Sequence, residues 1–227
     1  MKPIIQLRNV WKTYKMGDNI VHALRGINLD VMPGEFLAIQ GPSGSGKSTA
    51  MNLVGCLDVP SRGEIYLDGQ NIAKMSESNL ATIRGRKIGF IFQKFNLIET
   101  LTAFENAVLP MTFQGIPEDE RNKKAKQLLE QFGLGDRMHH KPGELSGGQQ
   151  QRVAIARSLA VDPPVILADE PTGNLDSKTG KEVMEFLREL HKHKDKTIVL
   201  VTHDDVLARF ADRVEYLKDG VIIKRRL

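Results

Sequence analysis

One short segment constrains the fold of this 227-residue chain more than any other. Residues 41–48, GPSGSGKS, match the pattern G-x-x-x-x-G-K-[ST] and lie between an apolar run, EFLAIQ, and a segment that reads as a helix. Glycines let the backbone wrap around an anion, while amide groups and a helix N-terminus supply positive potential. The pattern therefore predicts a phosphate-binding loop between a strand and a helix. Its expected binding residues are Gly41, Pro42, Ser43, Gly44, Ser45, Gly46, Lys47, Ser48 and Thr49.

Individual side chains near this loop have distinct expected tasks. Lys47 would reach the β- and γ-phosphates, and the Ser48 hydroxyl would bind Mg²⁺. Such a loop also needs a metal-binding acid at the end of a buried strand, and the apolar run VILAD ends in Asp169. Glu170 follows at once, so we expect it to reach the water that attacks the γ-phosphate. His203 ends the next apolar run, TIVLVTH, which predicts a contact with the γ-phosphate.

A second segment has the makeup of an anion-binding helix start. Residues 144–152 read ELSGGQQQR, and the continuation QQQRVAIARSLA reads as a helix. The segment lacks the lysine and the following hydroxyl that hold phosphate and Mg²⁺ in the first loop. By composition this segment therefore supplies only half of a phosphate-binding site.

The hydrophobic pattern predicts an α/β core with a helical insertion. The start of the chain alternates or runs apolar, as in IIQLRNVWKTY and HALRGINLDV, and VILAD and TIVLVTH are continuous apolar runs typical of buried parallel strands. From about residue 97 to 143 the pattern becomes helical, with one apolar stripe at Leu128, Leu129 and Phe132. SKTGKEVMEFLRELHKH reads as an amphipathic helix whose expected N-cap is Ser177.

Composition narrows the class of protein. The length suits one large α/β domain or two small lobes, and 41% hydrophobic and 26% charged residues are ordinary for a globular chain. A single cysteine, Cys56, excludes an intrachain disulfide and fits a reducing compartment. Despite a net charge of +4, no motif of interleaved aromatic and basic residues supports a nucleic-acid partner. No apolar run approaches the roughly 18–20 residues that span a bilayer, so a membrane part would come from another chain.

The motifs together resemble the ATP-binding-cassette (ABC) ATPases. LSGGQ precedes ADEPTGNLDS, with the phosphate loop upstream and VTHD downstream, and the likeness runs from VWKTY to LKDG. Flanking text such as IGFIFQKFNLI and ELSGGQQQRVAIARSLA is similar to the MacB/LolD-type subfamily of macrolide export and lipoprotein release, which partners FtsX-like permeases. The resemblance implies a P-loop NTPase fold with a RecA-like core, an antiparallel β subdomain and an inserted α-helical subdomain. It implies one domain over 1–227, with the core at about 1–96 and 160–227 and the helical subdomain at about 97–159.

The resemblance also assigns roles within one nucleotide site. Tyr14 would stack on adenine, and Gln93 would touch Mg²⁺ and link the core to the helical subdomain. Glu170 and His203 would form the catalytic pair, with Lys47 stabilising the transferred charge. ATP and Mg²⁺ are the implied cofactors.

Other roles implied by the resemblance act across a dimer. ATP would bind between the phosphate loop of one subunit and the signature of a second, head to tail, which accounts for the half site. Asp176 lies in the segment 174–177, the D-loop, which crosses the dimer interface in that family. The implied signature residues are Ser146, Gly147, Gly148 and Gln149.

The expected protein is thus an ATP-hydrolysing subunit on the cytoplasmic face of the cell membrane, bound to an FtsX-like permease that exports or releases a substrate. An alternative within the family is control of cell-wall hydrolases through a permease that moves no substrate. A protein acting on ribosomes or DNA would usually carry two fused cassettes or long coiled coils, and this chain has neither. A module that binds nucleotide without turnover fits poorly with Glu170 and His203.

Overall fold

The computed structural model describes residues 2–194 and 196–223. The chain folds into two compact units. The first, which we call the terminal unit, combines Met1–Arg84 with Leu190–Leu227, and the second, the middle unit, is Gly85–Glu189.

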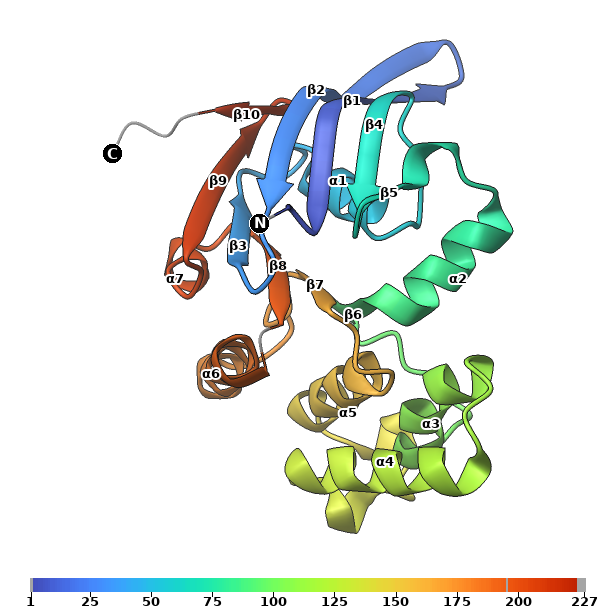
Figure 1. Ribbon diagram of the computed structural model, residues 1–227. Helices are drawn as coiled ribbons and strands as arrows, with labels where there is room; N and C mark the ends of the chain where they lie inside the picture. Colours follow the sequence, from blue (N-terminus) through green and yellow to red (C-terminus); the bar gives the residue numbers. More distant parts are fainter. Residues whose placement is uncertain (1, 195, 224–227) are drawn as a thin grey trace. The chain divides into compact units, whose positions relative to one another are not determined.

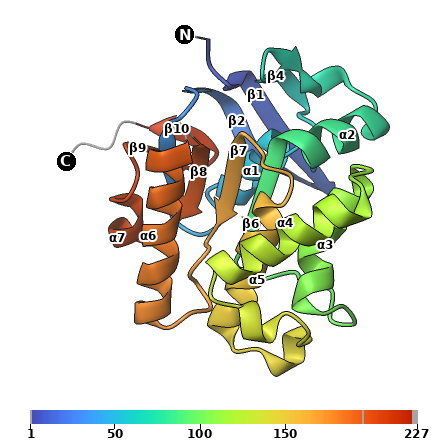
Figure 2. The same cartoon turned by 60° about the horizontal axis from the view of Figure 1, so that its bottom comes forward.

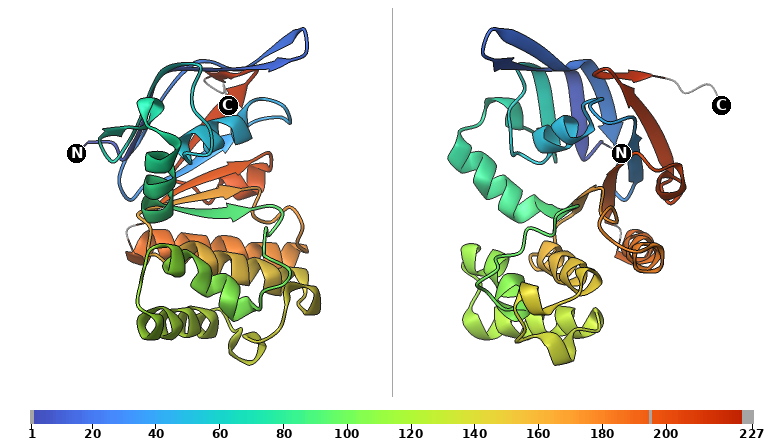
Figure 3. Two further views of the ribbon diagram at one scale, coloured as in Figure 1. Left: turned by 90° about the vertical axis from the view of Figure 1, so that its right-hand side faces the viewer. Right: turned by 180° about the vertical axis from the view of Figure 1, so that it is seen from behind.

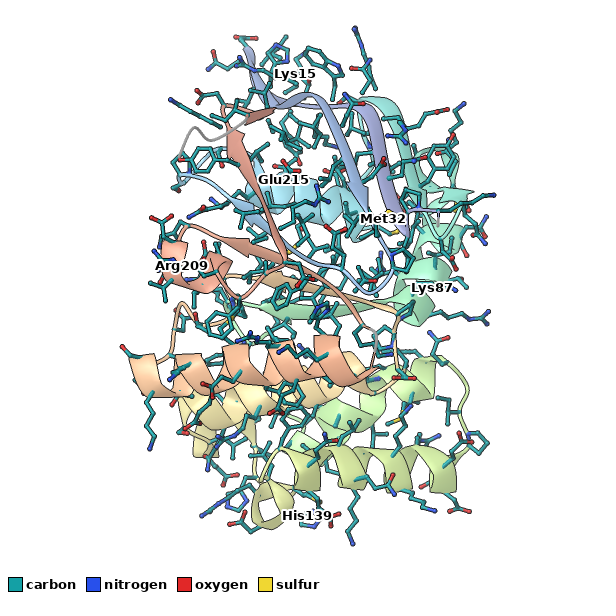
Figure 4. All side chains as sticks on the ribbon, turned by 60° about the vertical axis from the view of Figure 1, so that its left-hand side comes forward. Lys15, Met32, Lys87, His139, Arg209 and Glu215 are labelled. Carbon is teal, nitrogen blue, oxygen red and sulfur yellow. The ribbon has the colours of Figure 1, made fainter. Side chains whose placement is uncertain are left out.

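The chain passes between the two units inside helices. The first passage lies in α2 (Glu77–Lys87) and the second in α6 (Ser177–Lys194). Figure 4 labels Lys87, the last residue of α2, which already belongs to the middle unit. The predicted helical subdomain at about 97–159 is narrower than the middle unit and remains a prediction.

An antiparallel sheet forms the first half of the terminal unit, with strand order β2-β1-β4-β5 (Figure 1). Its centre is apolar because Ile5 on β1 pairs with Val31 on one side and Leu67 on the other, and each of the three is at most 2% exposed. Aligned apolar side chains on one face fix the register, since a slip by one residue would turn them all to the other face. The four strands are β1 (Ile5–Met16), β2 (Asn19–Val31), β4 (Arg62–Leu67) and β5 (Gln70–Asn71).

The rest of the terminal unit contains the strands that lead into the phosphate loop. β3 is parallel to β8 on one side and to β9 on the other, and β10 is antiparallel to β9. Every residue of β3 and β8 is buried, as expected for parallel strands covered on both faces. Helix α1 contacts β2 and β4 as well as β8 (Figure 3). The bounds are β3 (Phe36–Gln40), α1 (Lys47–Val54), η1 (Ile72–Lys74), β8 (Thr197–Thr202), α7 (Asp205–Ala208), β9 (Arg213–Lys218) and β10 (Val221–Ile223).

An ion-pair network holds β9 in place. Arg213 donates to Glu35 at 2.6 Å and to Glu215 at 2.5 Å, and it also donates to the backbone oxygen of Asp30. Figure 4 labels Glu215 on β9. One guanidinium therefore ties β9 to the C-terminal end of β2 and to the residue before β3.

The middle unit consists of two parallel strands and a group of helices. β6 and β7 run parallel, with Ile88 opposite Val165. Helices α3, α4 and α5 contact one another, and α5 also contacts β6 (Figure 2). Helix α3 begins at a capping box, in which Thr102 and Glu105 each bind the other's backbone amide. The bounds are β6 (Ile88–Phe92), α3 (Ala103–Phe113), α4 (Glu118–Gln131), η2 (Gly135–Arg137), η3 (Pro142–Glu144), α5 (Gly147–Leu159) and β7 (Val165–Asp169).

The structure confirms the predicted stripe on α4, because Leu128, Leu129 and Phe132 are all buried. The N-cap predicted for α6 is wrong by one residue. The carboxylate of Asp176, rather than the Ser177 hydroxyl, accepts from the second and third amides of the helix. A carboxylate is an equally good acceptor there and also complements the positive end of the helix dipole. None of the described helices is both long and apolar enough to cross a bilayer.

Candidate functional site

The phosphate loop connects β3 to α1 in a conformation that only glycine fits. Gly46 has φ 103°, and a Cβ there would lie 2.4 Å from the backbone oxygen of Ala23. At Gly41 a Cβ would lie 2.0 Å from the backbone oxygen of Leu217. At Gly44, by contrast, no heavy atom of the described residues lies within 4 Å of that position. The base of the loop is therefore packed against the protein, and its tip is open.

Lys47 supplies a positive charge inside this loop. Its side chain is only 8% exposed, and its ammonium group donates to the backbone oxygens of Gly41 at 2.8 Å and Pro42 at 2.9 Å. Ser43, Gly44 and Ser48 are exposed around it. A lysine held by carbonyls beneath an open glycine tip fits an anion of the size of a phosphate.

His203 leaves its strand at the same edge as the loop. Gln40, the last residue of β3, pairs with Thr202, the last residue of β8. Gly41 and His203 therefore follow neighbouring parallel strands at their carboxyl ends, where ligands of α/β sheets bind. His203 is exposed.

Tyr14 lies on β1 and is half-buried. Its hydroxyl donates to the carboxylate of Asp58 at 2.9 Å, and the Thr49 side chain of the phosphate loop lies beside it. Burial, followed by the interaction with Asp58, raises the pKa of the Tyr14 phenol above its ordinary value of 10.0. The terminal unit thus brings Tyr14 together with the end of the phosphate loop.

In the middle unit, Gln93 and the acidic pair leave adjacent strands. Phe92 at the end of β6 pairs with Asp169 at the end of β7, so Gln93 and Glu170 follow at the same edge. Glu170 has φ 45°, and its backbone oxygen accepts from the amide of Gly173 at 3.0 Å. A left-handed backbone conformation at a glutamate costs about 1–3 kcal/mol of conformational energy. Such strained residues cluster at functional sites.

The signature segment forms the start of α5. Ser146 is the N-cap, its hydroxyl accepts from the Gln149 amide at 3.3 Å, and the Gln149 side chain accepts from the Ser146 amide at 2.9 Å. This capping box confirms the predicted helix start. Gly147 and Gly148 occupy the first turn, where amides have no acceptor within the helix. A Cβ at Gly148 would lie 2.7 Å from the Thr179 methyl group.

The D-loop packs against both the signature and the Gln93 segment. Thr179, which touches Gly148, donates to the Asp176 carboxylate at 2.6 Å. This hydrogen bond, with backbone amides, holds the pKa of Asp176 below its ordinary value. Asn174 donates to the backbone oxygen of Gln93 at 2.8 Å. The middle unit therefore gathers Gln93, the signature and the D-loop into one connected group.

The sequence motifs do not predict two contacts that α5 makes in the middle unit. The side-chain amide of Gln151, which is fully buried, donates to the backbone oxygen of Pro171 at 2.6 Å and so fixes the loop that carries the acidic pair. Arg157 donates to the backbone oxygens of Asn96 at 2.5 Å and Phe95 at 3.0 Å. Burial lowers the pKa of its guanidinium below the ordinary value. The only sequence feature that indicates this contact is the position of Arg157 within the apolar run VAIARSLA.

Comparison with known proteins agrees with this geometry. A family model described as ABC transporter matches residues 24–173, which include the phosphate loop, the signature and the acidic pair. The chain belongs to the ABC transporter ATP-binding family. An ABC transporter ATP-binding protein of Thermotoga maritima is 52% identical to the cassette over 100% of this chain and 97% of its own length.

Solved structures and larger relatives extend the likeness. The cassette superposes on the ATP-binding cassette MJ0796, described as dimeric and bound to ADP and Pi in a post-hydrolysis state, with a TM-score of 0.91, 51% identity and coverage of 98% of this chain and 97% of that one. MJ0796 belongs to Methanocaldococcus jannaschii. The macrolide export ATP-binding/permease protein MacB of Hyphomonas neptunium is 51% identical over 97% of this chain. The cassette spans only 34% of that MacB protein.

Membership of the family confirms several predictions. The cassette binds ATP, and it is an ABC-type ATPase of a transporter. The predicted fold class, an α/β P-loop NTPase with a helical part, is confirmed by the superposition.

Proposed function

We propose that this cassette hydrolyses ATP as a head-to-tail homodimer that drives an FtsX-like membrane permease in export or in lipoprotein or peptide release. The observation that carries the proposal is the division of phosphate-facing elements within one chain. The phosphate loop has its lysine, Lys47, whereas residues 144–152, which include the capped start of α5 at Ser146, contain none. Each of two identical sites would then take the loop from one subunit and the signature from the other.

Each residue of the proposed nucleotide site has a defined task. Tyr14 stacks on adenine, residues 41–49 hold the phosphates, and Lys47 turns from its loop carbonyls to the β- and γ-phosphates. Bound Mg²⁺ would offset the charge of those phosphates. Its proposed ligands, the Ser48 hydroxyl, the Gln93 amide oxygen and the Asp169 carboxylate, are the oxygen donors that Mg²⁺ takes.

The proposed chemistry needs one base and two stabilising groups. Glu170 accepts a proton from the water that attacks the γ-phosphate, while His203 and Lys47 stabilise charge on the transferred group. The left-handed backbone of Glu170 supports this role, since such strain is retained where the side chain must be aimed. Ser146, Gly147, Gly148 and Gln149 would contact the γ-phosphate from the other subunit, and Asp176 would lie at the dimer interface.

The larger relatives support the membrane partner. MacB is named as an ATP-binding and permease protein, and this chain matches about a third of it. By analogy with the ATP-binding part of MacB, the cassette would act on a permease, at the cytoplasmic face of the cell membrane. Closure on ATP and opening after hydrolysis would then move the permease between two states.

Replacement of Glu170 by Gln tests the proposal. The variant should bind ATP as the wild type does, release phosphate at least about a hundredfold more slowly, and form a stable dimer with Mg-ATP. Phosphate release and light scattering measure the two effects. Glu189→Gln, the same change on the exposed face of α6, is the control and should behave as wild type. Turnover near the wild-type rate with only monomer in solution would rule out the role of Glu170.

A further inference from the structure

Two charged side chains, Asp58 and Lys12, form a compact cluster with Tyr14. Asp58, in the loop between α1 and β4, accepts from the Tyr14 hydroxyl at 2.9 Å through one oxygen and from the Lys12 ammonium at 2.5 Å through the other. The same ammonium donates to the backbone oxygen of Val59 at 2.8 Å. Both carboxylate oxygens of Asp58 are therefore engaged, and Lys12 is anchored twice.

These bonds have a defined direction. Because the phenol donates its proton to Asp58, its oxygen keeps its capacity to accept, and the Thr49 side chain of the phosphate loop lies beside it. The phenol oxygen thus lies between the Asp58 carboxylate and the Thr49 side chain. It connects the orientation of the ring to the loop that holds phosphate.

Lys12 also restricts which face of the ring can be used. Its ammonium lies 4.9 Å from the centroid of the Tyr14 ring, a cation–π contact, and Lys12 is only 9% exposed. A planar base can stack only on the opposite face.

We propose that Asp58 and Lys12 are positioning residues for the nucleotide base: they hold the Tyr14 ring in one orientation relative to the phosphate loop and leave one face for stacking. The inference rests on the proposed stacking role of Tyr14. Its physical basis is preorganisation, because a ring already fixed before binding loses less conformational freedom when the base arrives. A role limited to stabilising the fold would affect every ligand of the phosphate loop equally.

The test compares a ligand that has a base with one that lacks it. Dissociation constants for ADP and for inorganic pyrophosphate are measured with Mg²⁺, by displacement of a ribose-labelled fluorescent ADP, for wild type, Asp58→Asn and Tyr14→Phe. Each change should weaken ADP binding about three- to tenfold, the loss expected for one typical hydrogen bond. Pyrophosphate affinity should stay within about twofold. KM for ATP should rise while kcat at saturation stays within about twofold.

Three further variants distinguish the possible failures. Tyr66→Phe removes a matching phenol–carboxylate bond, to Glu64 at 3.0 Å in the same sheet, and should leave ADP affinity unchanged. Tyr14→Ala removes the ring and should weaken ADP by about tenfold or more. Because one bond is at issue, Asp58→Asn combined with Tyr14→Phe should weaken ADP little more than either change alone.

Each other outcome overturns a specific statement. If Tyr14→Ala weakens ADP but Asp58→Asn and Tyr14→Phe do not, the positioning role is wrong and stacking by Tyr14 stands. If Tyr14→Ala also binds ADP as wild type does, the stacking role itself is wrong. Equal weakening of ADP and pyrophosphate in Asp58→Asn would make Asp58 a support of the phosphate loop instead.

Discussion

The side-chain amide of Asn174 donates a hydrogen bond to the backbone oxygen of Gln93 at 2.8 Å. Arg157 of α5 binds the same segment two and three residues further on, at the oxygens of Phe95 and Asn96. The segment after β6 is thus held by the D-loop and by the helix that starts with the signature. Motion of the D-loop or of α5 relative to this segment would therefore strain these bonds.

Replacement of Arg157 by Lys should destabilise the cassette. A planar guanidinium reaches two carbonyls at once, whereas an ammonium on a shorter stem leaves one of them without its charged donor. The free energy of unfolding should fall by about 1–3 kcal/mol, read from urea denaturation. Arg188→Lys, on the exposed face of α6, is the control, and equal midpoints for the two variants would contradict the prediction.

Loss of the Lys47 ammonium should abolish turnover. Lys47→Met keeps the buried stem but removes the charge that the loop carbonyls hold, so phosphate release should fall at least about a hundredfold. Lys47→Arg should also lose turnover. Lys47 is only 8% exposed, so the larger guanidinium group of arginine has no room there. Phosphate release measures both effects, and calorimetric melting checks that the fold persists. Wild-type rates in either variant would contradict the assignment.

Ser146→Arg should prevent ATP-induced dimers while a single subunit still binds ATP. The change removes the cap of α5, at a cost of about 1 kcal/mol, and places a long side chain at the signature. Light scattering in the Glu170→Gln background follows dimer formation, and equilibrium titration follows ATP binding. Ser146→Thr keeps the capping hydroxyl and should still dimerise. Loss of nucleotide binding by the monomer would show that the signature and Lys47 serve the same subunit's site.

Cys56 should stay unreactive until the protein unfolds. The thiol is 2% exposed, and burial raises its pKa from 9.0 to about 11, against a smaller opposite effect of Arg84. Between these values the unfolded chain loses the proton that the folded form keeps, so the free energy of unfolding should decrease as pH rises. In Cys56→Ala the decrease between pH 9 and 11 should be smaller than in the wild type, because the contribution of the thiol is removed. Rapid reaction of the native thiol with a disulfide reagent at pH 8 would contradict the prediction.

Local patterns predicted a large part of this structure. The strand before the phosphate loop, the helix after it and the capped start of α5 all follow from residues adjacent in the sequence, since glycine spacing, apolar runs and caps act over a few positions. Such patterns place a helix end only to within one or two residues. At the start of α6, Asp176 and Ser177 are both good caps, and only the backbone geometry selects Asp176.

Contacts between distant residues required the structure. Asp58 is 44 residues from Tyr14, Arg157 is 62 from Phe95, and Gln151 is 20 from Pro171. No periodicity in the chain encodes such pairs, because they form only when packing of the core brings separate elements together.

The sequence by itself determined that the chain carries a complete phosphate loop and a signature without a lysine, because those properties reside in contiguous residues. Only the tertiary structure decided that the Tyr14 ring is tied to Asp58 and Lys12, and that the signature helix holds the segments carrying Gln93 and the acidic pair. The physical reason is that a hydrogen bond between distant residues depends on the packing of whole strands and helices, which no short stretch of chain contains.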